Sequence, residues 1–362
     1  MPSFDIIRKN TPKQSFRVKS VMGTFDLQTH NIEERFKGSF DLSNDWQIGV
    51  IVGNSGTGKT TIAKELFSDN YITNFNYKAD NILDDMPSDK SITDITKAFN
   101  SVGFSSPPNW LKPYNVLSNG EKMRVDLARA MLENKDLFVF DEFTSVVDRN
   151  VAKIGSLAMQ KAIRKTNKKF IAVGCHFDII DWLMPDWVFN TNDMTFQSFE
   201  GQKKNRPTYN LKIYETKAKS IFWEMFRKYH YLSHSLNKSG RVFILTLNDI
   251  VCGFCSVLPF PHPKKKNVWK EHRVVILPDF QGIGLGSFIS ENVAEILKSE
   301  NKGLISTSSN PAFIFARKKS KKWVLTRIGR TSSGSGSGKI QNKYKKGSTS
   351  SNRITVSFQY IG

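Results

Sequence analysis

The 362-residue sequence lacks the features that mark membrane and secreted proteins. No apolar run approaches the roughly 20 residues that a membrane-spanning helix needs. The first residues, MPSFDIIRKNTPK, have no apolar signal-peptide core. Hydrophobic residues make up 39% and charged residues 24%, which is typical of folded domains. We therefore expect a cytoplasmic protein long enough for two domains.

Cysteine is scarce, which excludes a disulfide framework. The three cysteines are Cys175, Cys252 and Cys255, and the last two form a C-x-x-C pair within the stretch DIVCGFCSVLPF. This stretch is typical of a strand, and residues three apart on a strand face opposite sides. One metal ion would not easily reach both thiols. We favour a core role for this pair over a metal-binding or redox role.

Acidic residues are scarce in the C-terminal half. Residues 203–362 contain 29 Lys/Arg and 8 Asp/Glu, whereas residues 1–202 contain 24 and 25. Basic runs occur at 263–270, 316–323 and 339–348. Such an excess is typical of proteins that bind polyanions, so we favour nucleic acid as a partner over a merely soluble basic surface.

One motif in the N-terminal half indicates a phosphate-binding loop. The stretch WQIGVIV predicts a buried strand, which runs into the pattern G-x-x-x-x-G-K-T and a following helix, TIAKELF. The glycines let backbone N–H groups turn toward a β-phosphate, Lys59 reaches the β/γ oxygens, and Thr60 binds Mg²⁺. The residues expected to bind ATP are Gly53, Asn54, Ser55, Gly56, Thr57, Gly58, Lys59, Thr60 and Thr61.

Four further stretches follow in a fixed order. They are VLSNGEKMRVDLARAML (116–132), KDLFVFDEF (135–143), TSVVD (144–148) and FIAVGCH (170–176). A strand that ends in two adjacent carboxylates can give one to Mg²⁺ and the other to an attacking water. This order resembles the ATP-binding-cassette (ABC) ATPases over about residues 15–200.

The ABC resemblance implies a role for each matching position. Ser118, Gly120 and Glu121 match the signature motif that binds nucleotide. The other implied positions are Asp141 as an Mg²⁺ ligand with Thr60, Glu142 as the catalytic base, Asp148 in the D-loop and His176 as the switch histidine. Because the signature of one ABC copy completes the ATP site of another, we expect a head-to-tail homodimer around ATP.

The sequence departs from the ABC pattern at two places. Asn119 replaces the second signature glycine, and no glutamine occurs between Lys59 and Ser118 to form the Q-loop that couples to a membrane domain. The missing Q-loop and the absence of membrane-spanning runs argue against a transporter. Asp84 and Asp85 are candidate replacements.

The stretch SFRVKSVMGTFDLQ, from about residue 16, alternates like a strand.

The C-terminal half predicts a mixed α+β domain. A polar linker at 201–210 precedes strands and helices that lead to a glycine turn, VVILPDFQGIGLGSFI. The third glycine comes one residue too early for a dinucleotide-binding fingerprint. The stretch resembles motif A of the GCN5-related N-acetyltransferases (GNAT), and the element order matches that family over about 207–362. We therefore expect an α/β chain: an ABC ATPase domain (1–200), then an α+β GNAT domain (211–362) with a flexible basic loop at 331–352.

The GNAT resemblance implies that this turn binds acetyl-CoA or another acyl-CoA. Free N–H groups and a helix N-terminus would hold the coenzyme pyrophosphate, and strand backbone at Val275 and Ile276 would lie near the thioester. The implied turn residues are Gln281, Gly282, Ile283, Gly284, Leu285 and Gly286.

The acyl-transfer chemistry stays open at this stage. Glu271 or His272 is the candidate base, directly or through water. The tyrosine acid common in GNAT enzymes is replaced by Phe313 and Phe315, so either Ser308, Ser309 or water acts, or the reaction needs no strong acid. The stretch KYHYLSH (228–234) is either a substrate-binding loop or an amphipathic helix end.

Three functions are consistent with these features. The first is an ATP-dependent nucleic-acid N-acyltransferase, DNA favoured, in a bacterial or phage-infected cytosol; a weaker resemblance to Mom-type phage DNA-modification proteins supports it. The second is an ATP-regulated acetyltransferase of protein or small-molecule amines. The third is a DNA-binding ABC clamp with an inactive GNAT half. Salt-sensitive binding to nucleic acid would favour the first.

Overall fold

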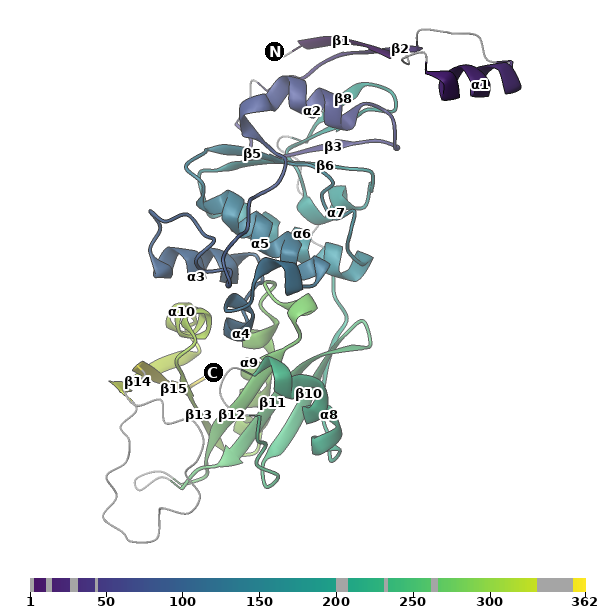
Figure 1. Ribbon diagram of the computed structural model, residues 1–362. Helices are drawn as coiled ribbons and strands as arrows, with labels where there is room; N and C mark the ends of the chain where they lie inside the picture. Colours follow the sequence, from purple (N-terminus) through teal and green to yellow (C-terminus); the bar gives the residue numbers. More distant parts are fainter. Residues whose placement is uncertain are drawn as a thin grey trace. The chain divides into compact units, whose positions relative to one another are not determined.

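The computed structural model describes residues 3–10, 15–26, 32–42, 45–199, 208–230, 234–261, 266–330 and 354–362 (Figure 1). The chain forms two compact units. The first unit comprises residues 1–75, 134–146 and 163–206, and the second comprises 76–133, 147–162 and 207–362. Within the described part of the chain, no helix is long and apolar enough to cross a membrane.

The first unit is built on a six-stranded sheet in the order β4-β5-β6-β3-β7-β8. Its strands are β3 (Ile48–Val52), β4 (Tyr71–Ile72), β5 (Leu137–Phe140), β6 (Lys169–Gly174), β7 (Trp187–Asn190) and β8 (Thr195–Ser198). All pair in parallel except β8, which is antiparallel to β7. Strand β3 is central and fully buried, as its apolar run predicts. Outside its N-terminal segment, the described α-helices of this unit are α2 (Lys59–Phe67) and α7 (Ile179–Leu183).

The N-terminal segment of the first unit corrects one prediction. Strands β1 (Ser3–Asn10) and β2 (Ile32–Ser39) form a separate antiparallel pair. Between them, Phe16–Thr24 is helix α1, not the predicted strand. The Ser15 side chain accepts a hydrogen bond from Val18 N at 3.3 Å, so it caps the helix. No residue of α1 is buried, so the alternation of its sequence does not reflect a sheet face.

The second unit combines a helical part with a large sheet. The helical part contains α3 (Ile92–Ser101), α4 (Pro107–Trp110), α5 (Asn119–Leu132) and α6 (Arg149–Ile163). The sheet has the order β14-β15-β13-β12-β11-β10-β9. Its strands are β9 (Leu211–Glu215), β10 (Arg241–Leu247), β11 (Ile250–Pro259), β12 (Val268–Ile276), β13 (Gly303–Ser308), β14 (Trp323–Arg330) and β15 (Ile354–Tyr360). Its helices are α8 (Lys219–Phe226), α9 (Leu285–Ser299) and α10 (Pro311–Lys319).

The two central strands of this sheet diverge. β12 pairs in parallel with β13 only from Val268 to Lys270, while its other edge pairs with β11 as far as Ile276. The second half of β12 therefore leaves β13 and leads into the glycine turn before α9. Val275 and Ile276, the strand positions that the sequence analysis singles out, lie in this diverging part of β12.

One boundary between the compact units, at residues 206 and 207, lies within the expected linker at 201–210, but two inner segments of the expected ATPase domain belong to the second unit. Residues 76–133 and 147–162, which include the signature motif, group with 207–362. Ile154 of α6 belongs to the same core cluster as Leu285 and Val293 of α9, which explains the grouping. Most of the expected linker (201–207) and the expected basic loop (331–352) lie outside the described residues.

The cysteine pair has the expected core role, but by a different geometry. Cys252 and Cys255 are both fully buried and belong to one cluster, not to opposite faces. The pairing of β10 with β11 shifts between Leu245 and Thr246, and Cys252 is the extra residue of this bulge. A bulge reverses the alternation of side chains, which the sequence alone does not indicate.

Candidate functional site

The first phosphate-binding turn joins β3 to α2. Gly56 and Gly58 have φ of +85° and +86°, a region that side chains with a Cβ rarely adopt. Lys59 begins α2, is buried, and its Nζ donates to the Asn54 carbonyl at 2.6 Å. The turn is held from behind, because Asn54 N donates to Asn192 Oδ1 at 2.8 Å. This geometry fits a nucleotide polyphosphate, because the loop would surround the phosphates and Lys59 lies against the loop.

The two predicted Mg²⁺ ligands lie together. Thr60 Oγ1 donates to Asp141 Oδ2 at 2.8 Å, at the end of β5. Sequence reasoning missed Tyr71, whose hydroxyl donates to the same carboxylate oxygen from the neighbouring strand β4. Burial, followed by this hydrogen bond, raises the pKa of Tyr71 well above its usual range. The hydroxyl and carboxylate oxygens are hard donors, which fit Mg²⁺.

The remaining candidates of the first unit follow the same strand ends. Glu142 comes directly after Asp141 with φ of +51°, and its N–H donates to Asp141 Oδ1 at 2.9 Å. His176 follows β6 and is half-buried. Since β5 and β6 pair in parallel, both residues lie beyond the same edge of the sheet. Their catalytic roles stay predictions.

The signature residues belong to the second unit, at the start of α5. Ser118 Oγ accepts from Glu121 N at 3.3 Å, and Glu121 Oε2 accepts from Ser118 N at 3.0 Å. This capping box fixes the helix start. Asp148 precedes α6 and accepts from Asn150 N at 2.8 Å. The nucleotide contacts of Ser118, Gly120, Glu121 and Asp148 stay predictions.

The second phosphate-binding turn joins β12 to α9. Gly282 and Gly284 have φ of +93° and +99°, and Gly284 is the N-cap of α9. A Cβ at Gly284 would meet nothing within 4 Å, whereas one at Gly286 would lie 3.1 Å from Phe313. A turn that is exposed and open at Gly284, at a helix N-terminus, fits an anion such as a coenzyme pyrophosphate.

The residues before this turn are arranged by Gln281. Its Nε2 donates to the Ile276 carbonyl at 2.8 Å, so the side chain braces the strand end and is partly turned away from a ligand. Val275 and Ile276 are buried on opposite faces of the sheet, in different core clusters. Their backbone lies where β12 has left β13, which fits a pantetheine chain inserted between the strands.

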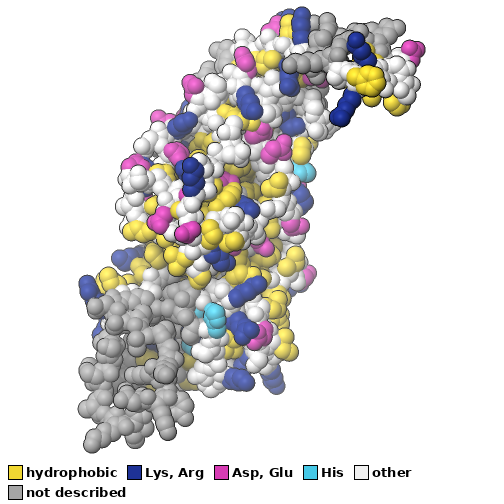
Figure 2. Space-filling view, viewed as in Figure 1, with side chains coloured by type: hydrophobic (Ala, Val, Ile, Leu, Met, Phe, Trp, Pro, Cys, Tyr) yellow, Lys and Arg dark blue, Asp and Glu magenta, His cyan; other side chains and the backbone are white. Residues whose placement is uncertain are grey.

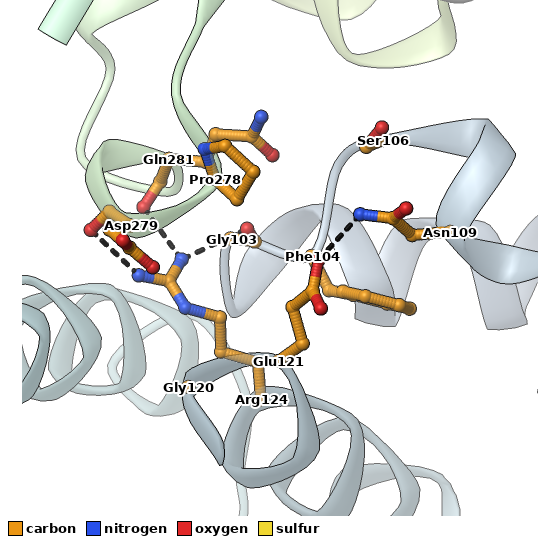
Figure 3. Close-up of a pocket in the computed structure, with 10 residues that line it drawn as sticks. All are labelled: Gly103, Phe104, Ser106, Asn109, Gly120, Glu121, Arg124, Pro278, Asp279 and Gln281. Atoms are coloured by element: carbon orange, nitrogen blue, oxygen red, sulfur yellow. Dashed lines mark hydrogen bonds between the residues drawn. The ribbon is translucent and has the colours of Figure 1, made fainter. Parts of the chain in front are cut away.

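The second turn is supported by helices of the predicted ATPase region (Figure 3). Arg124 of α5, which sequence reasoning missed, is 2% exposed. Its Nη1 donates to the Gln281 carbonyl at 3.0 Å and to the Gly103 carbonyl at 2.9 Å. Its Nη2 donates to the Asp279 carbonyl at 3.0 Å. Burial lowers the pKa of Arg124 to about 10. No local sequence pattern distinguishes this arginine.

The surroundings of Glu271 argue against its predicted role as the base. Its carboxylate pairs with Arg317 Nη2 at 2.7 Å, with side chains only 8% and 4% exposed. Ser290 Oγ donates to it at 2.6 Å, and the Ser306 hydroxyl also donates. This buried carboxylate links β12 to α9, β13 and α10. Protonating it would remove the charge that pairs with the buried Arg317, so it is poorly suited to accept a proton.

His272 is therefore the better base candidate. It is half-buried at a bulge of β12, with Nδ1 3.4 Å from Ser256 Oγ. Burial, Arg273 and Lys270 lower the pKa of His272 to about 4. The imidazole is thus neutral at physiological pH and can accept a proton.

The other chemistry-bearing candidates are less defined. Ser308 Oγ accepts a hydrogen bond from Asn310 N at 3.0 Å. Phe315 is exposed, and neither it nor Phe313 has a proton to donate, since phenylalanine has no acidic group. Tyr229 and His230 end the segment after α8, and His230 is buried 6.0 Å from the Trp223 ring. Residues 231–233 of the predicted substrate loop lie outside the described chain.

Comparison with known sequences finds a match to one family model over part of the chain. The model of the acetyltransferase (GNAT) family matches residues 177–314. Two curated proteins are similar in part. [NU+] prion formation protein 1 of Saccharomyces cerevisiae is 33% identical over 101 residues, 28% of this chain and 8% of that protein. ABC multidrug transporter E of Aspergillus fumigatus is 26% identical over 123 residues, 34% of this chain and 9% of that protein. The chain thus matches less than a tenth of each relative's length.

Solved structures of two kinds are similar to this chain. The ribosomal-protein-S18-alanine N-acetyltransferase of Escherichia coli has 15% identity and a TM-score of 0.31, covering 42% of this chain and 93% of that one. A dimeric bacterial ABC transporter cassette has 14% identity and a TM-score of 0.36, covering 46% of this chain and 93% of that one. The chain is thus similar to the GNAT acetyltransferase family over residues 177–314, and solved structures of both GNAT acetyltransferases and ABC cassettes resemble parts of it.

Proposed function

We propose that this protein is an ATP-dependent, acyl-CoA-dependent N-acyltransferase that modifies nucleic acid, with DNA favoured. The observation that carries the acyl-transfer part is the GNAT match across an open glycine turn at the N-terminus of α9. The charge of residues 203–362, a net of +21, supports a nucleic-acid substrate.

The ATPase part rests on the first turn. Lys59 and the P-loop amides bind the phosphates, and Thr60 and Asp141 hold Mg²⁺, which neutralises charge on the transferred phosphoryl group. Glu142 orients and deprotonates the attacking water, and His176 contacts the γ-phosphate. Ser118 and Gly120 contact the ATP of a second copy, in a head-to-tail homodimer.

The transfer part rests on the second turn and on β12. The amides of Gly282, Gly284 and Gly286 hold the coenzyme pyrophosphate, and the coenzyme supplies the activated acyl group as a thioester. His272, neutral near pH 7, accepts the proton that the amine loses as the new N–C bond forms. Water protonates the leaving thiolate, since Phe313 and Phe315 stand where an acidic side chain is expected.

The described surface supports contact with a nucleic-acid backbone. Exposed basic side chains gather at the end of α10 and along the edge strand β14: Lys318, Lys319, Lys321, Lys322, Arg327 and Arg330. Figure 2 also has dark blue Lys and Arg side chains, with few magenta ones, over the C-terminal sheet on the face it draws. Such a surface attracts phosphates without reading sequence, so affinity falls steeply with salt.

The test is mass spectrometry of nucleosides from DNA and RNA of cells that express the protein. Lys59→Ala disables the first turn, and Gly284→Trp fills the open space of the second. We expect a new acylated nucleoside from the wild type and from neither variant, and its mass identifies the acyl group. If both nucleoside pools stay unchanged while the purified protein acylates peptides or polyamines, the substrate is an amine of another class. If CoA does not bind, the GNAT half is inactive and the protein is a clamp.

A further inference from the structure

The helix that begins with the signature motif also holds the coenzyme turn. Arg124 lies in the second turn of α5, and its described hydrogen bonds all go to backbone carbonyls. Two of these carbonyls, of Asp279 and Gln281, belong to the coenzyme turn. A buried guanidinium is costly unless its donors are satisfied, so this attachment is tight.

Two further contacts fix the same turn. Ser105 N donates to Gln281 Oε1 at 3.0 Å, and Lys161 Nζ of α6 donates to the Ile283 carbonyl at 3.1 Å. The backbones also approach closely: a Cβ at Gly282 would lie 2.8 Å from Ala158 Cβ and 2.9 Å from Gly103 Cα. The helices and the turn therefore cannot shift separately without breaking packed contacts.

The direction of these bonds determines where the turn's amides point. In a planar trans peptide, the C=O of one residue and the N–H of the next point in opposite directions. Arg124 holds the Gln281 carbonyl, and Lys161 holds the Ile283 carbonyl. The N–H groups of Gly282 and Gly284 are therefore directed away from α5 and α6, toward the side on which an anion can bind.

We propose that Arg124 is a positioning residue that couples the signature helix α5 to the coenzyme turn, so that ATP in the dimer tightens binding of CoA. The inference rests on the proposed function, because it takes Ser118 and Gly120 as contacts to ATP of a second copy. ATP contact at the start of α5 restrains the helix, and Arg124 passes this restraint to the peptides that bind pyrophosphate. By linkage, CoA tightens binding of ATP by the same factor.

The test is calorimetric titration of CoA into the full-length protein, with and without Mg²⁺ and a non-hydrolysable ATP analogue. For the wild type, we expect the analogue to lower the Kd of CoA about fivefold or more. In Arg124→Met, the ratio of the CoA Kd without the analogue to the Kd with it should fall to near one. Arg124→Lys, which keeps the charge but loses the planar fork, should retain part of the ratio. The shift of the unfolding midpoint by the analogue should be preserved in both.

Arg129→Met is the matched control, since Arg129 lies on the same helix but donates to the Asp85 carbonyl at 2.7 Å. It should keep the wild-type ratio. If Arg124→Met does not fold, Lys161→Ala replaces it, because Lys161 is exposed and its loss should lower the ratio in part. CoA binding without any effect of the analogue in the wild type would overturn this inference alone. No CoA binding by the wild type would overturn the proposed acyl transfer, and the inference with it.

Discussion

The two phosphate-binding turns share a backbone design and differ in the residues after the last glycine. In each, a glycine with φ near +90° is the N-cap of a helix: Gly58 before α2 and Gly284 before α9. The first turn continues with Lys59, whose ammonium donates to the Asn54 carbonyl of the loop, and Thr60, whose hydroxyl donates to Asp141. The second continues with Leu285 and Gly286, which offer no charged or hydroxyl side chain, so an anion bound there would meet backbone amides.

This difference matches the needs of the two ligands that we propose for the turns. A nucleoside triphosphate whose γ-phosphate is transferred needs a cation and Mg²⁺ to neutralise the charge that develops. A coenzyme pyrophosphate only has to be held, and a helix N-terminus with free amides is sufficient. The supports differ too: residues of the first unit hold the first turn, whereas the signature helix holds the second.

The strongest test of this contrast is Lys59→Ala. Removing the ammonium should lower ATP hydrolysis by about 10²- to 10³-fold, the loss typical of one preorganised charge-stabilising group. CoA affinity measured without nucleotide should equal that of the wild type. Hydrolysis by phosphate release and CoA titration check both parts, and a parallel loss of CoA binding would contradict the division of roles.

The reciprocal change is Gly284→Trp. The position requires a positive φ, which costs a side chain about 1–3 kcal/mol, and the indole also occupies the open side of the turn. We expect the Kd of CoA to rise about 100-fold while ATP hydrolysis without CoA is retained. Titration and the hydrolysis assay check this, with Gly303→Ala as the control, at an exposed glycine of β13 with free space and no positive φ.

What the sequence predicted was local. Both turns, the strands beside them and the pairing of Thr60 with Asp141 follow from short motifs whose geometry is set by neighbouring residues. What it missed depends on residues far apart: the Arg124 bonds to Asp279 and Gln281, and the capture of Glu271 by Arg317. No spacing rule indicates such contacts, because the tertiary fold alone brings those segments together.

The prediction errors have local causes as well. The sequence of helix α1 predicts a strand because its alternating side chains outweigh the single capping residue Ser15. Cys252 and Cys255 are predicted to face opposite sides because a one-residue bulge leaves no trace in composition. Both errors concern periodicity, which predicts a face only where the pairing is regular.

A smaller effect is expected from Tyr71→Phe, which tests whether the Mg²⁺ site is braced. The hydroxyl donates to the carboxylate of Asp141, and without it the carboxylate is less well oriented. The Kd of Mg²⁺–ATP should rise about fivefold to tenfold, or about 1 kcal/mol. Tyr114→Phe is the control, because it removes a comparable hydrogen bond to Asp126, 2.7 Å long, from the second unit. Equal effects of both changes on ATP affinity would contradict the bracing role.

The smallest expected effect is the pH dependence that His272 confers. Its pKa is lowered to about 4 in the folded protein, from about 6.5 in the unfolded chain. As pH falls below 6.5, His272 becomes protonated in the unfolded chain but stays neutral in the folded protein, so the free energy of unfolding decreases. This contribution is complete above pH 6.5 and is lost as pH falls toward 4. Because the ring is only half-buried, solvent screening limits it to about 1 kcal/mol.

The measurement is urea unfolding of the wild type and of His272→Gln at pH 7 and pH 4.5. The variant should lose less stability between the two pH values than the wild type, by about 1 kcal/mol. The same pKa predicts that the acid limb of kcat/KM for acyl transfer, where it reflects this base, lies near pH 4. If the acid limb of kcat/KM lies near pH 6.5 and persists in His272→Gln, another group is the base. If it lies near pH 6.5 and is lost in His272→Gln, His272 is the base, but its ring is more solvated than its neighbours Lys270 and Arg273 imply.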